Sequence, residues 1–246
     1  MPCHIAEFCS AHYNVLIMFY ILAALLFLGL LFLPRVWVRN AIASQAGERP
    51  DFPGTGGELA RHLLDDARLE HVTVEALPVE GGDHYDPVAK AVRLSPSNHN
   101  GKSVSAVAIA AHEVGHALQD GEGYKPLALR TRMAGAAQKI QAIGSLLLIG
   151  APLVMAITRK PSILLLELGA GLAIMATGIV VHLITLPVEF DASFKRALPI
   201  LKNGQYLHPD DLPGAKKVLR AAAFTYVAAA MVSLLDIMRW LRILRF

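Results

Sequence analysis

Two histidines and a glutamate stand close together in SVSAVAIAAHEVGHALQDGEG (103–123), a segment whose other residues are mostly small or apolar. The HEVGH core places His112 and His116 one helical turn apart, so both imidazoles project from the same face of a helix. Glu113 directly follows the first histidine. Two imidazoles beside a carboxylate are what a zinc-dependent hydrolase requires, namely two metal ligands and a base for the water that the metal activates.

Coincidence is the alternative, because a His-Glu-x-x-His pattern arises by chance in roughly one such sequence in sixty. The surroundings favour the metal. Ionisable side chains on so apolar a helix are costly to bury unless they have a partner such as a metal ion. Gly115, within the motif, costs the helix about 1 kcal/mol relative to alanine. We therefore expect another segment to pack closely against Gly115.

The composition predicts a membrane protein, since 54% of the 246 residues are apolar and only 17% are charged. Uncharged or nearly uncharged runs cover 15–33, 141–158 and 162–187, and a shorter run, the weakest candidate, covers 221–238. A bilayer core takes about 20 apolar residues in a helix. We expect a mainly α membrane protein with three to four transmembrane helices. They would anchor an α+β, zincin-like catalytic domain that has a small β-hairpin or sheet.

The runs divide the chain into an expected order of segments. These are an N-terminal tail (1–14), a transmembrane anchor (15–33), a catalytic domain with the HEVGH helix (34–140), a transmembrane hairpin (141–187), a cytoplasmic segment (188–220), an apolar segment that crosses or lies on the membrane (221–238) and a basic tail (239–246).

Basic residues near the spans predict the orientation, because they favour the cytoplasmic side. Most of them lie in 34–140 and 188–220, which places the active site on the cytoplasmic face of the cell membrane. The basic tail disagrees with this orientation if the fourth run crosses the bilayer. A cleaved signal peptide is disfavoured, because no basic stretch precedes 15–33.

The two cysteines, Cys3 and Cys9, both lie in the expected tail. They could form a local disulfide or a second metal site. We favour the alternative, a flexible tail in which they have no special role. The rest of the chain has no cysteine, which excludes a thiolate zinc site there. The excess charge of +3 lies beside the spans and does not predict nucleic-acid binding.

A zinc ion held by two histidines needs a third protein ligand. If 141–187 forms a hairpin, the chain returns to the membrane face of the HEVGH helix at LPVEFDASFKRAL, and Glu189 is the first acidic residue there. Pro187 suits the first turn of a new helix, in which Glu189 would follow. The alternative is an acidic residue that only complements the helix dipole. We expect Glu189 to be the third ligand.

The remaining soluble segments predict one helix and a small sheet. A helix is expected over 54–68, where Thr55 and Glu58 form a capping box. Residues 71–77 alternate like a strand, and 84–95 reads as a hairpin. A strand ahead of the zinc helix can bind a substrate backbone by edge addition.

Three polar residues, two in the hairpin and one near the end of the HEVGH helix, each have two possible roles. His84 and Tyr85 either donate a hydrogen bond to the reacting carbonyl oxygen or fix the hairpin, and we favour the second. Asp120 lies one turn beyond His116, where it either accepts a hydrogen bond from a ligand imidazole or ends the helix with Gly121 as the stop.

The chain resembles the YugP-like membrane zinc metallopeptidases, which are related in layout to HtpX-like membrane proteases. The resemblance rests on TGGELAR (55–61), DHYDP (83–87), AVRLS (91–95), AAHEVGHALQD (110–120) and TLPVEFDAS (185–193). It implies hydrolysis of peptide bonds.

The resemblance also implies roles for individual residues. His112, His116 and Glu189 would be the Zn²⁺ ligands, and Glu113 the base. Relatives have an acidic residue four positions after the ligand glutamate, where this chain has Ser193. Asp191 or Asp120 are candidates to supply that acidic group.

Two rival functions remain at this point. In an intramembrane metalloprotease of the site-2 type, Asp210 or Asp211 would replace Glu189 as the ligand, but the apolar run 104–118 is about five residues short of a span. A non-catalytic membrane adaptor or metal-binding protein would have no need of Glu113. The expected partners are therefore a peptide or protein substrate, including membrane proteins, and the lipid bilayer.

Overall fold

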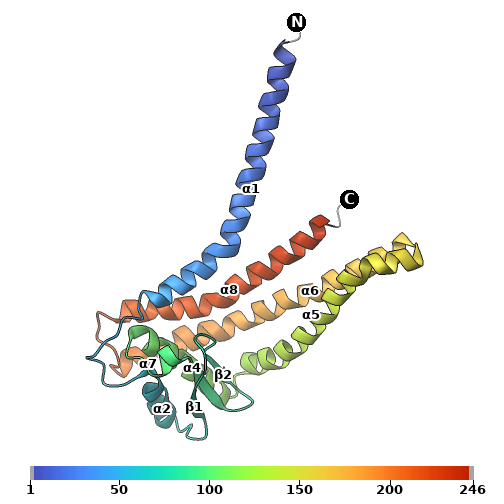
Figure 1. The fold of residues 1–246 in the computed structure, drawn as a ribbon. Helices are drawn as coiled ribbons and strands as arrows, with labels where there is room; N and C mark the ends of the chain where they lie inside the picture. Colours follow the sequence, from blue (N-terminus) through green and yellow to red (C-terminus); the bar gives the residue numbers. More distant parts are fainter. Residues whose placement is uncertain (1–2, 244–246) are drawn as a thin grey trace.

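The computed structural model describes residues 3–243, except for the side chains of 3–17, of 235–243 and of some further positions in the long helices. The elements are α1 (Cys3–Ala43), α2 (Gly56–Asp66), β1 (Thr73–Ala76), β2 (His84–Asp86), β3 (Ala91–Leu94), α3 (Pro96–His99), α4 (Val104–Gly121), α5 (Lys125–Thr158), α6 (Pro161–Phe190), a π-helical segment η1 (Asp191–Ala197), α7 (Leu198–Asn203) and α8 (Leu212–Ile243). Residues 44–124 and 188–220 form one compact lobe, from which α1, α8 and the α5–α6 hairpin extend (Figure 1).

The small sheet has the strand order β1-β3-β2. β1 is parallel to β3, whereas β2 is antiparallel to β3, with His84 opposite Arg93. Asp86 stabilises the turn of this hairpin, because its Oδ1 atom accepts hydrogen bonds from the backbone N–H groups of Val88 and Ala89. The hairpin over 84–95 and the strand within 71–77 are confirmed, and the order leaves β2 at an edge.

The expected helix over 54–68 corresponds to α2, and its capping box is present. Thr55 Oγ1 accepts from the N–H of Glu58, and the Glu58 carboxylate accepts from the N–H of Thr55. The two glycines of the TGGELAR motif bring this helix end against the backbone before α4. A Cβ on Gly57 would lie 2.9 Å from the carbonyl oxygen of His99.

α4 is the central element of the compact lobe. Ser103 caps it by accepting a hydrogen bond from the N–H of Ala106. Nearly all of its residues from Val104 to Gln119 are buried. Its small side chains let α2, η1, α8 and the sheet pack against it on several sides. The HEVGH motif therefore lies inside the lobe and not at its surface.

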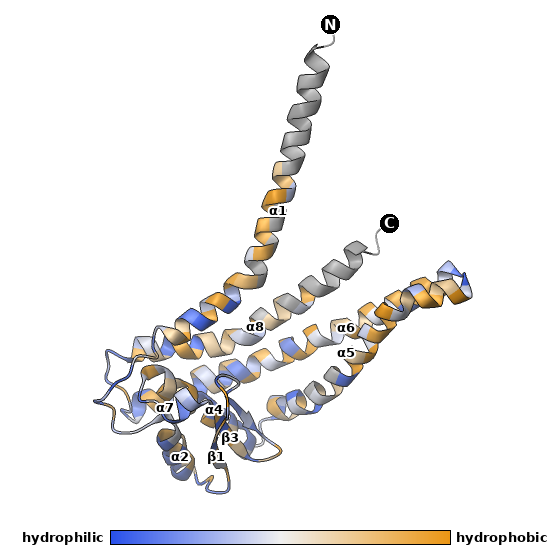
Figure 2. Ribbon diagram, viewed as in Figure 1, coloured by the Kyte–Doolittle hydropathy of each residue, from blue (hydrophilic) through white to orange (hydrophobic). Residues whose placement is uncertain are grey.

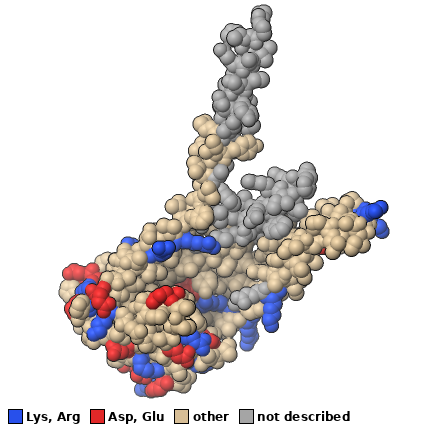
Figure 3. Space-filling view, viewed as in Figure 1, with Lys and Arg blue, Asp and Glu red and all other residues tan. Residues whose placement is uncertain are grey.

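The α5–α6 hairpin carries the two helices that are long and apolar enough to cross a membrane, Lys125–Thr158 and Pro161–Asn203, the second of which includes η1 and α7. Its outer face exposes large apolar side chains, which include Leu146, Ile149, Leu153, Ile157, Leu165 and Leu166. Figure 2 shows hydrophobic residues along the outer half of the hairpin, and Figure 3 shows basic residues at its tip, where the chain turns at Arg159 and Lys160.

The expectation of three to four transmembrane helices is corrected to two candidate spans in the described part of the chain. The other two runs, 15–33 and 221–238, lie within α1 and α8 and include residues whose side chains are outside the description. They remain predictions for this reason.

One expectation about a helix end was wrong. Pro187 does not begin a new helix, because α6 runs through it to Phe190 and continues as η1. The N–H of a proline is missing, but a contact from the lobe holds this turn, since Gln119 Nε2 donates to the carbonyl of Val188 at 2.9 Å. α1 begins at Cys3 and so includes most of the segment expected as an N-terminal tail, whose lack of a special role stays a prediction. The side chains of Cys3 and Cys9 lie outside the described residues.

Candidate metal centre

The side chains of His112, His116 and Glu189 meet inside the compact lobe, and all three are buried. Glu189 Oε2 lies 3.2 Å from His112 Nε2 and 3.4 Å from His116 Nε2. The two histidines come from α4, and Glu189 comes from the last turn of α6, just before η1, which packs against α4. One potential ligand atom from each residue falls within 4.8 Å of the others.

The other nitrogen of each imidazole has a hydrogen-bond partner that fixes its tautomer. His116 Nδ1 lies 2.9 Å from Gln119 Oε1, an acceptor, so Nδ1 carries the proton. Ser193 Oγ donates to the carbonyl of Leu219 at 3.0 Å, so the same oxygen accepts from His112 Nδ1 at 3.0 Å. Both Nε2 atoms therefore have a free lone pair that faces Glu189.

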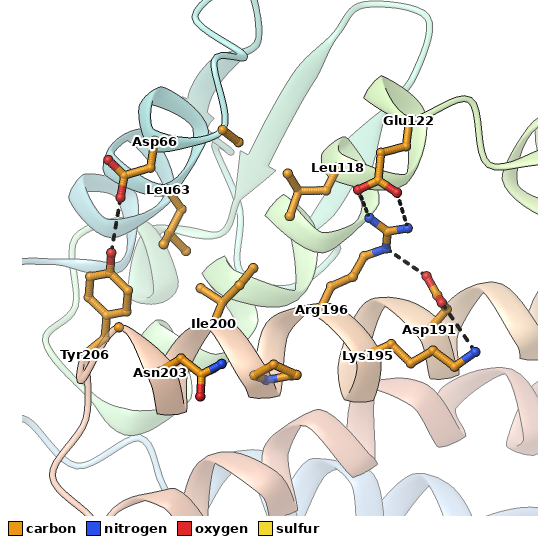
Figure 4. A pocket seen from close by; sticks show the side chains of 13 residues that line it. Leu63, Asp66, Leu118, Glu122, Asp191, Lys195, Arg196, Ile200, Asn203 and Tyr206 are labelled. Atoms are coloured by element: carbon orange, nitrogen blue, oxygen red, sulfur yellow. Dashed lines mark hydrogen bonds and ion pairs between the residues drawn. The ribbon is translucent and has the colours of Figure 1, made fainter.

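Asp191 reaches the centre through Gln119. Gln119 is fully buried, and its Nε2 atom donates to Asp191 Oδ2 at 2.9 Å. Asp191 also accepts from Arg196 Nε, and Arg196 in turn makes two hydrogen bonds to Glu122. Figure 4 shows this part of the network at the wall of a cavity of about 660 Å³ on another side of the lobe. None of the expected ligands lines that cavity.

Glu113 lines a separate cavity of about 300 Å³ together with His112, His116 and Glu189. Burial raises the pKa of Glu113 to about 7, and the neighbouring Glu189 carboxylate adds to this effect. A general base acts best when its pKa lies near the working pH. In the metal-free protein, both the position and the pKa of Glu113 therefore suit it to exchange a proton with a molecule bound beside the cluster.

The donor set fits a zinc ion. Ligand atoms at about 2.1 Å from a tetrahedral zinc ion lie about 3.4 Å from one another, which matches the separations of Glu189 from the two imidazoles. Glu189 Oε1 is buried and has no hydrogen-bond partner among the described residues. Two neutral imidazoles and one carboxylate also leave a fourth position for water or substrate, as in catalytic zinc sites.

The structure decides between the two readings of Tyr85 and Asp120. Tyr85 donates to Asp120 Oδ2 at 2.6 Å, and Lys90 pairs with the same carboxylate. Tyr85 thus fixes the hairpin to α4, as we favoured, and Asp120 is not a partner of either imidazole. His84 Nδ1 contacts only its own turn, at the carbonyl of Gly82.

The acidic group that the family pattern places after the third ligand has no direct equivalent at the imidazoles. Ser193 itself contacts His112, and Asp191 acts on His116 only through Gln119.

Asp211, the ligand of the intramembrane alternative, pairs with Arg49 at 2.6 Å, away from the cluster. Neither it nor Asp210 belongs to the group that could hold a metal.

Sequence reasoning missed three residues at this centre. Gln119 could have been found, because it lies three residues after His116 and so faces the same side of α4. Arg130 of α5 and Tyr226 of α8 also line the cavity. No local pattern marks them, since they come from helices that are distant in the chain.

A buried His-His-Glu cluster with an adjacent glutamate defines the class of zinc-dependent hydrolases. The family model described as "Putative neutral zinc metallopeptidase" matches residues 19–245. The "Putative membrane protease YugP" of Bacillus subtilis (strain 168) is 37% identical over 228 residues, which cover 92% of this chain and 96% of that protein. No solved structure gives a significant match.

The chain belongs to this family of zinc metallopeptidases, and zinc is its metal. The resemblance to YugP-like proteins that the motifs predicted is confirmed. Association with a membrane agrees with the relative's description and with the two apolar helices of the hairpin.

Proposed function

We propose that the protein is a membrane-embedded zinc endopeptidase that binds zinc through His112, His116 and Glu189. The observation that carries the proposal is the convergence of both Nε2 atoms on Glu189 Oε2, with Glu113 in the same cavity. The tautomers set by Gln119 and Ser193 support it, because both histidines then present a lone pair to the metal.

Glu113 is the general base of the proposed reaction. Zinc in such a site lowers the pKa of water towards about 7 and polarises a carbonyl group. Glu113 takes a proton from the attacking water and later delivers it to the amine that leaves when the peptide C–N bond breaks. Its place in the cavity of the cluster supports both transfers, because it lies beside the position that water or substrate would take.

The substrate is a polypeptide that binds along β2. β2 is an edge strand, and its residues His84 and Tyr85 line the cavity of the metal cluster. Backbone pairing with an edge strand is largely independent of side chains, so we expect tolerance of substrate sequence.

The α5–α6 hairpin crosses the membrane in this proposal, and the compact lobe lies on the cytoplasmic side. Multi-pass insertion is supported by the exposed apolar face of the hairpin and by the basic residues that flank it in the sequence.

The rival intramembrane mechanism is disfavoured because Asp211 is engaged with Arg49. The adaptor is disfavoured because a purely structural site has no use for Glu113.

Metal content and peptidase activity of the protein purified in detergent test this proposal. We expect one zinc per chain in the wild type, loss of zinc in Glu189→Ala, and full zinc without activity in Glu113→Gln. The matched control is Glu70→Gln, which removes an exposed carboxylate elsewhere. Full zinc in Glu189→Ala would assign the third ligand elsewhere. A zinc-loaded wild type without peptidase activity would favour the adaptor.

A further inference from the structure

Arg130 and Tyr226 form a polar pair at the metal cavity. Arg130 lies near the start of α5, and Tyr226 lies near the middle of α8. Both line the cavity that contains His112, Glu113 and Glu189. Apart from the helices of the cluster itself, these two long helices thus bring polar side chains to the place where the chemistry is proposed to occur.

The contacts of Arg130 define the geometry of the pair. Its Nη2 atom donates to the Tyr226 hydroxyl oxygen at 2.6 Å, and its guanidinium carbon lies 5.2 Å from the centre of the tyrosine ring. Its Nη1 atom lies 3.2 Å from Glu189 Oε1 without an aligned hydrogen bond. The guanidinium therefore connects Tyr226 to the carboxylate of the proposed third ligand.

This arrangement leaves the hydroxyl hydrogen of Tyr226 available. The phenolic oxygen accepts from Arg130, and among the described hydrogen bonds the tyrosine donates none. Tyr226 therefore has an O–H group free to donate to whatever occupies the cavity.

Other donors at this cavity are already engaged. Tyr85 donates to Asp120 at 2.6 Å. Thr225 donates to the carbonyl of Ala221 at 3.1 Å. His84 is exposed and bonded within its own turn. Among the side chains of the described lining, the half-buried Arg130 and Tyr226 are thus the donors that remain for a substrate, in addition to the backbone of β2.

We propose that Tyr226 is a catalytic residue that donates a hydrogen bond to the carbonyl oxygen of the scissile peptide bond, and that Arg130 is its positioning residue. The inference rests on the proposed peptidase function. When the water oxygen bonds to the carbonyl carbon, the π pair of the C=O bond moves onto the oxygen, which becomes negative. A donor aimed at that oxygen stabilises the transition state more than the bound substrate.

Tyr226→Phe is the direct test, since it removes one hydroxyl and keeps the ring. Three quantities are measured: zinc content, kcat and KM for a peptide substrate, and the Kd of a phosphinic peptide whose tetrahedral phosphorus mimics the transition state. The Kd of the uncleaved substrate is measured in the Glu113→Gln background. The matched control is Tyr206→Phe, because the Tyr206 hydroxyl contacts Asp66 at the other cavity (Figure 4) and also the nearby His62.

We expect Tyr226→Phe to lower kcat/KM by about 10²–10³-fold, which is the typical loss for one such donor. The affinity for the phosphinic peptide should fall by a similar factor, whereas the affinity for the substrate and the zinc content stay close to those of the wild type. Tyr206→Phe should change none of these. Wild-type kcat/KM in Tyr226→Phe, or equal losses in the affinities for substrate and phosphinic peptide, would overturn the proposal.

Arg130→Gln tests the positioning role, with Arg132→Gln on the same helix as its control. Residues that act as a unit are non-additive, so the Arg130→Gln/Tyr226→Phe double variant should lose little more than Tyr226→Phe alone. Fully additive losses would refute the positioning role.

Failure of the proposed function itself gives a different pattern. The zinc-loaded wild type would then be inactive, while Tyr226→Phe would still lower the affinity for the phosphinic peptide.

Discussion

The backbone of Gly115 packs against the carbonyl group of Ala192. A Cβ on Gly115 would lie 2.9 Å from Ala192 O and 3.4 Å from Ala192 Cα. Gly115 lies between the two histidines of α4, and Ala192 lies just after Glu189. The close packing that the helix glycine predicted is confirmed, and it sets the separation of the two helices that carry the cluster.

Gly115→Ala is therefore expected to push η1 and the end of α6 away from α4. We expect a loss of stability of about 1–3 kcal/mol, as for other overpacked sites. The affinity for zinc should fall as well, because Glu189 moves from the imidazoles. Thermal unfolding and competition with a chromophoric chelator measure the two effects. Gly135→Ala is the control, since its Cβ would meet nothing within 4 Å. Equal zinc affinity in both variants would contradict this account.

Gln119→Leu should weaken zinc binding about 10–100-fold, the usual cost of losing a hydrogen-bond partner of a metal ligand. The variant removes the acceptor of His116 Nδ1 and the donor to Asp191. A zinc titration of the purified protein checks it. Retention of wild-type affinity would show that helix packing alone orients His116.

Ser193→Ala leaves the buried N–H of His112 without its acceptor. A buried donor that loses its partner costs about 1–3 kcal/mol, and we expect this loss in the free energy of unfolding together with weaker zinc binding. Ser105→Ala is the matched control, because the buried Ser105 Oγ has no hydrogen-bond partner among the described residues. The prediction fails if the two serine variants are equally stable.

The pH dependence of stability should report Glu113 in the metal-free protein. Burial raises its pKa from 4.5 to about 7, so the folded chain holds more protons than the unfolded chain between these values. The free energy of unfolding must then fall as the pH rises through this window, by about 3 kcal/mol at most. Thermal unfolding at several pH values measures the slope.

Glu113→Gln should remove most of that slope, because the amide does not titrate. Zinc should also reduce it in the wild type, since a nearby cation favours the charged carboxylate. A slope that persists in Glu113→Gln would mean that other groups cause it.

The sequence predicted the parts of the centre that depend on local spacing. The helical period relates His112 to His116, and the capping box and the Asp86 turn are equally local. Glu189 was reached by following the expected hairpin back to the same membrane face. Arg130 could not be found in this way, since its role depends on how α5 and α8 pack around the cavity.

Local rules failed where contacts between distant segments override them. Pro187 was expected to begin a helix, but α6 continues through it, and Gln119 holds the next carbonyl from α4. Asp120 was a plausible partner for a ligand imidazole by spacing, yet the hairpin residues Tyr85 and Lys90 engage it instead. The spacing of residues along one helix does not tell which neighbouring element reaches them.

Glu189 stands at the end of α6, whose preceding residues form a candidate span. A helix of this length measures about 45 Å, so a tilt of roughly one degree about its far end displaces Glu189 by about 0.8 Å. Metal–ligand distances tolerate only about 0.2 Å. In the proposed membrane-embedded protein, a change in bilayer thickness that tilts α6 would therefore change the distance between Glu189 and the two imidazoles. Zinc affinity should vary with lipid acyl-chain length, which titrations in vesicles of defined composition would measure.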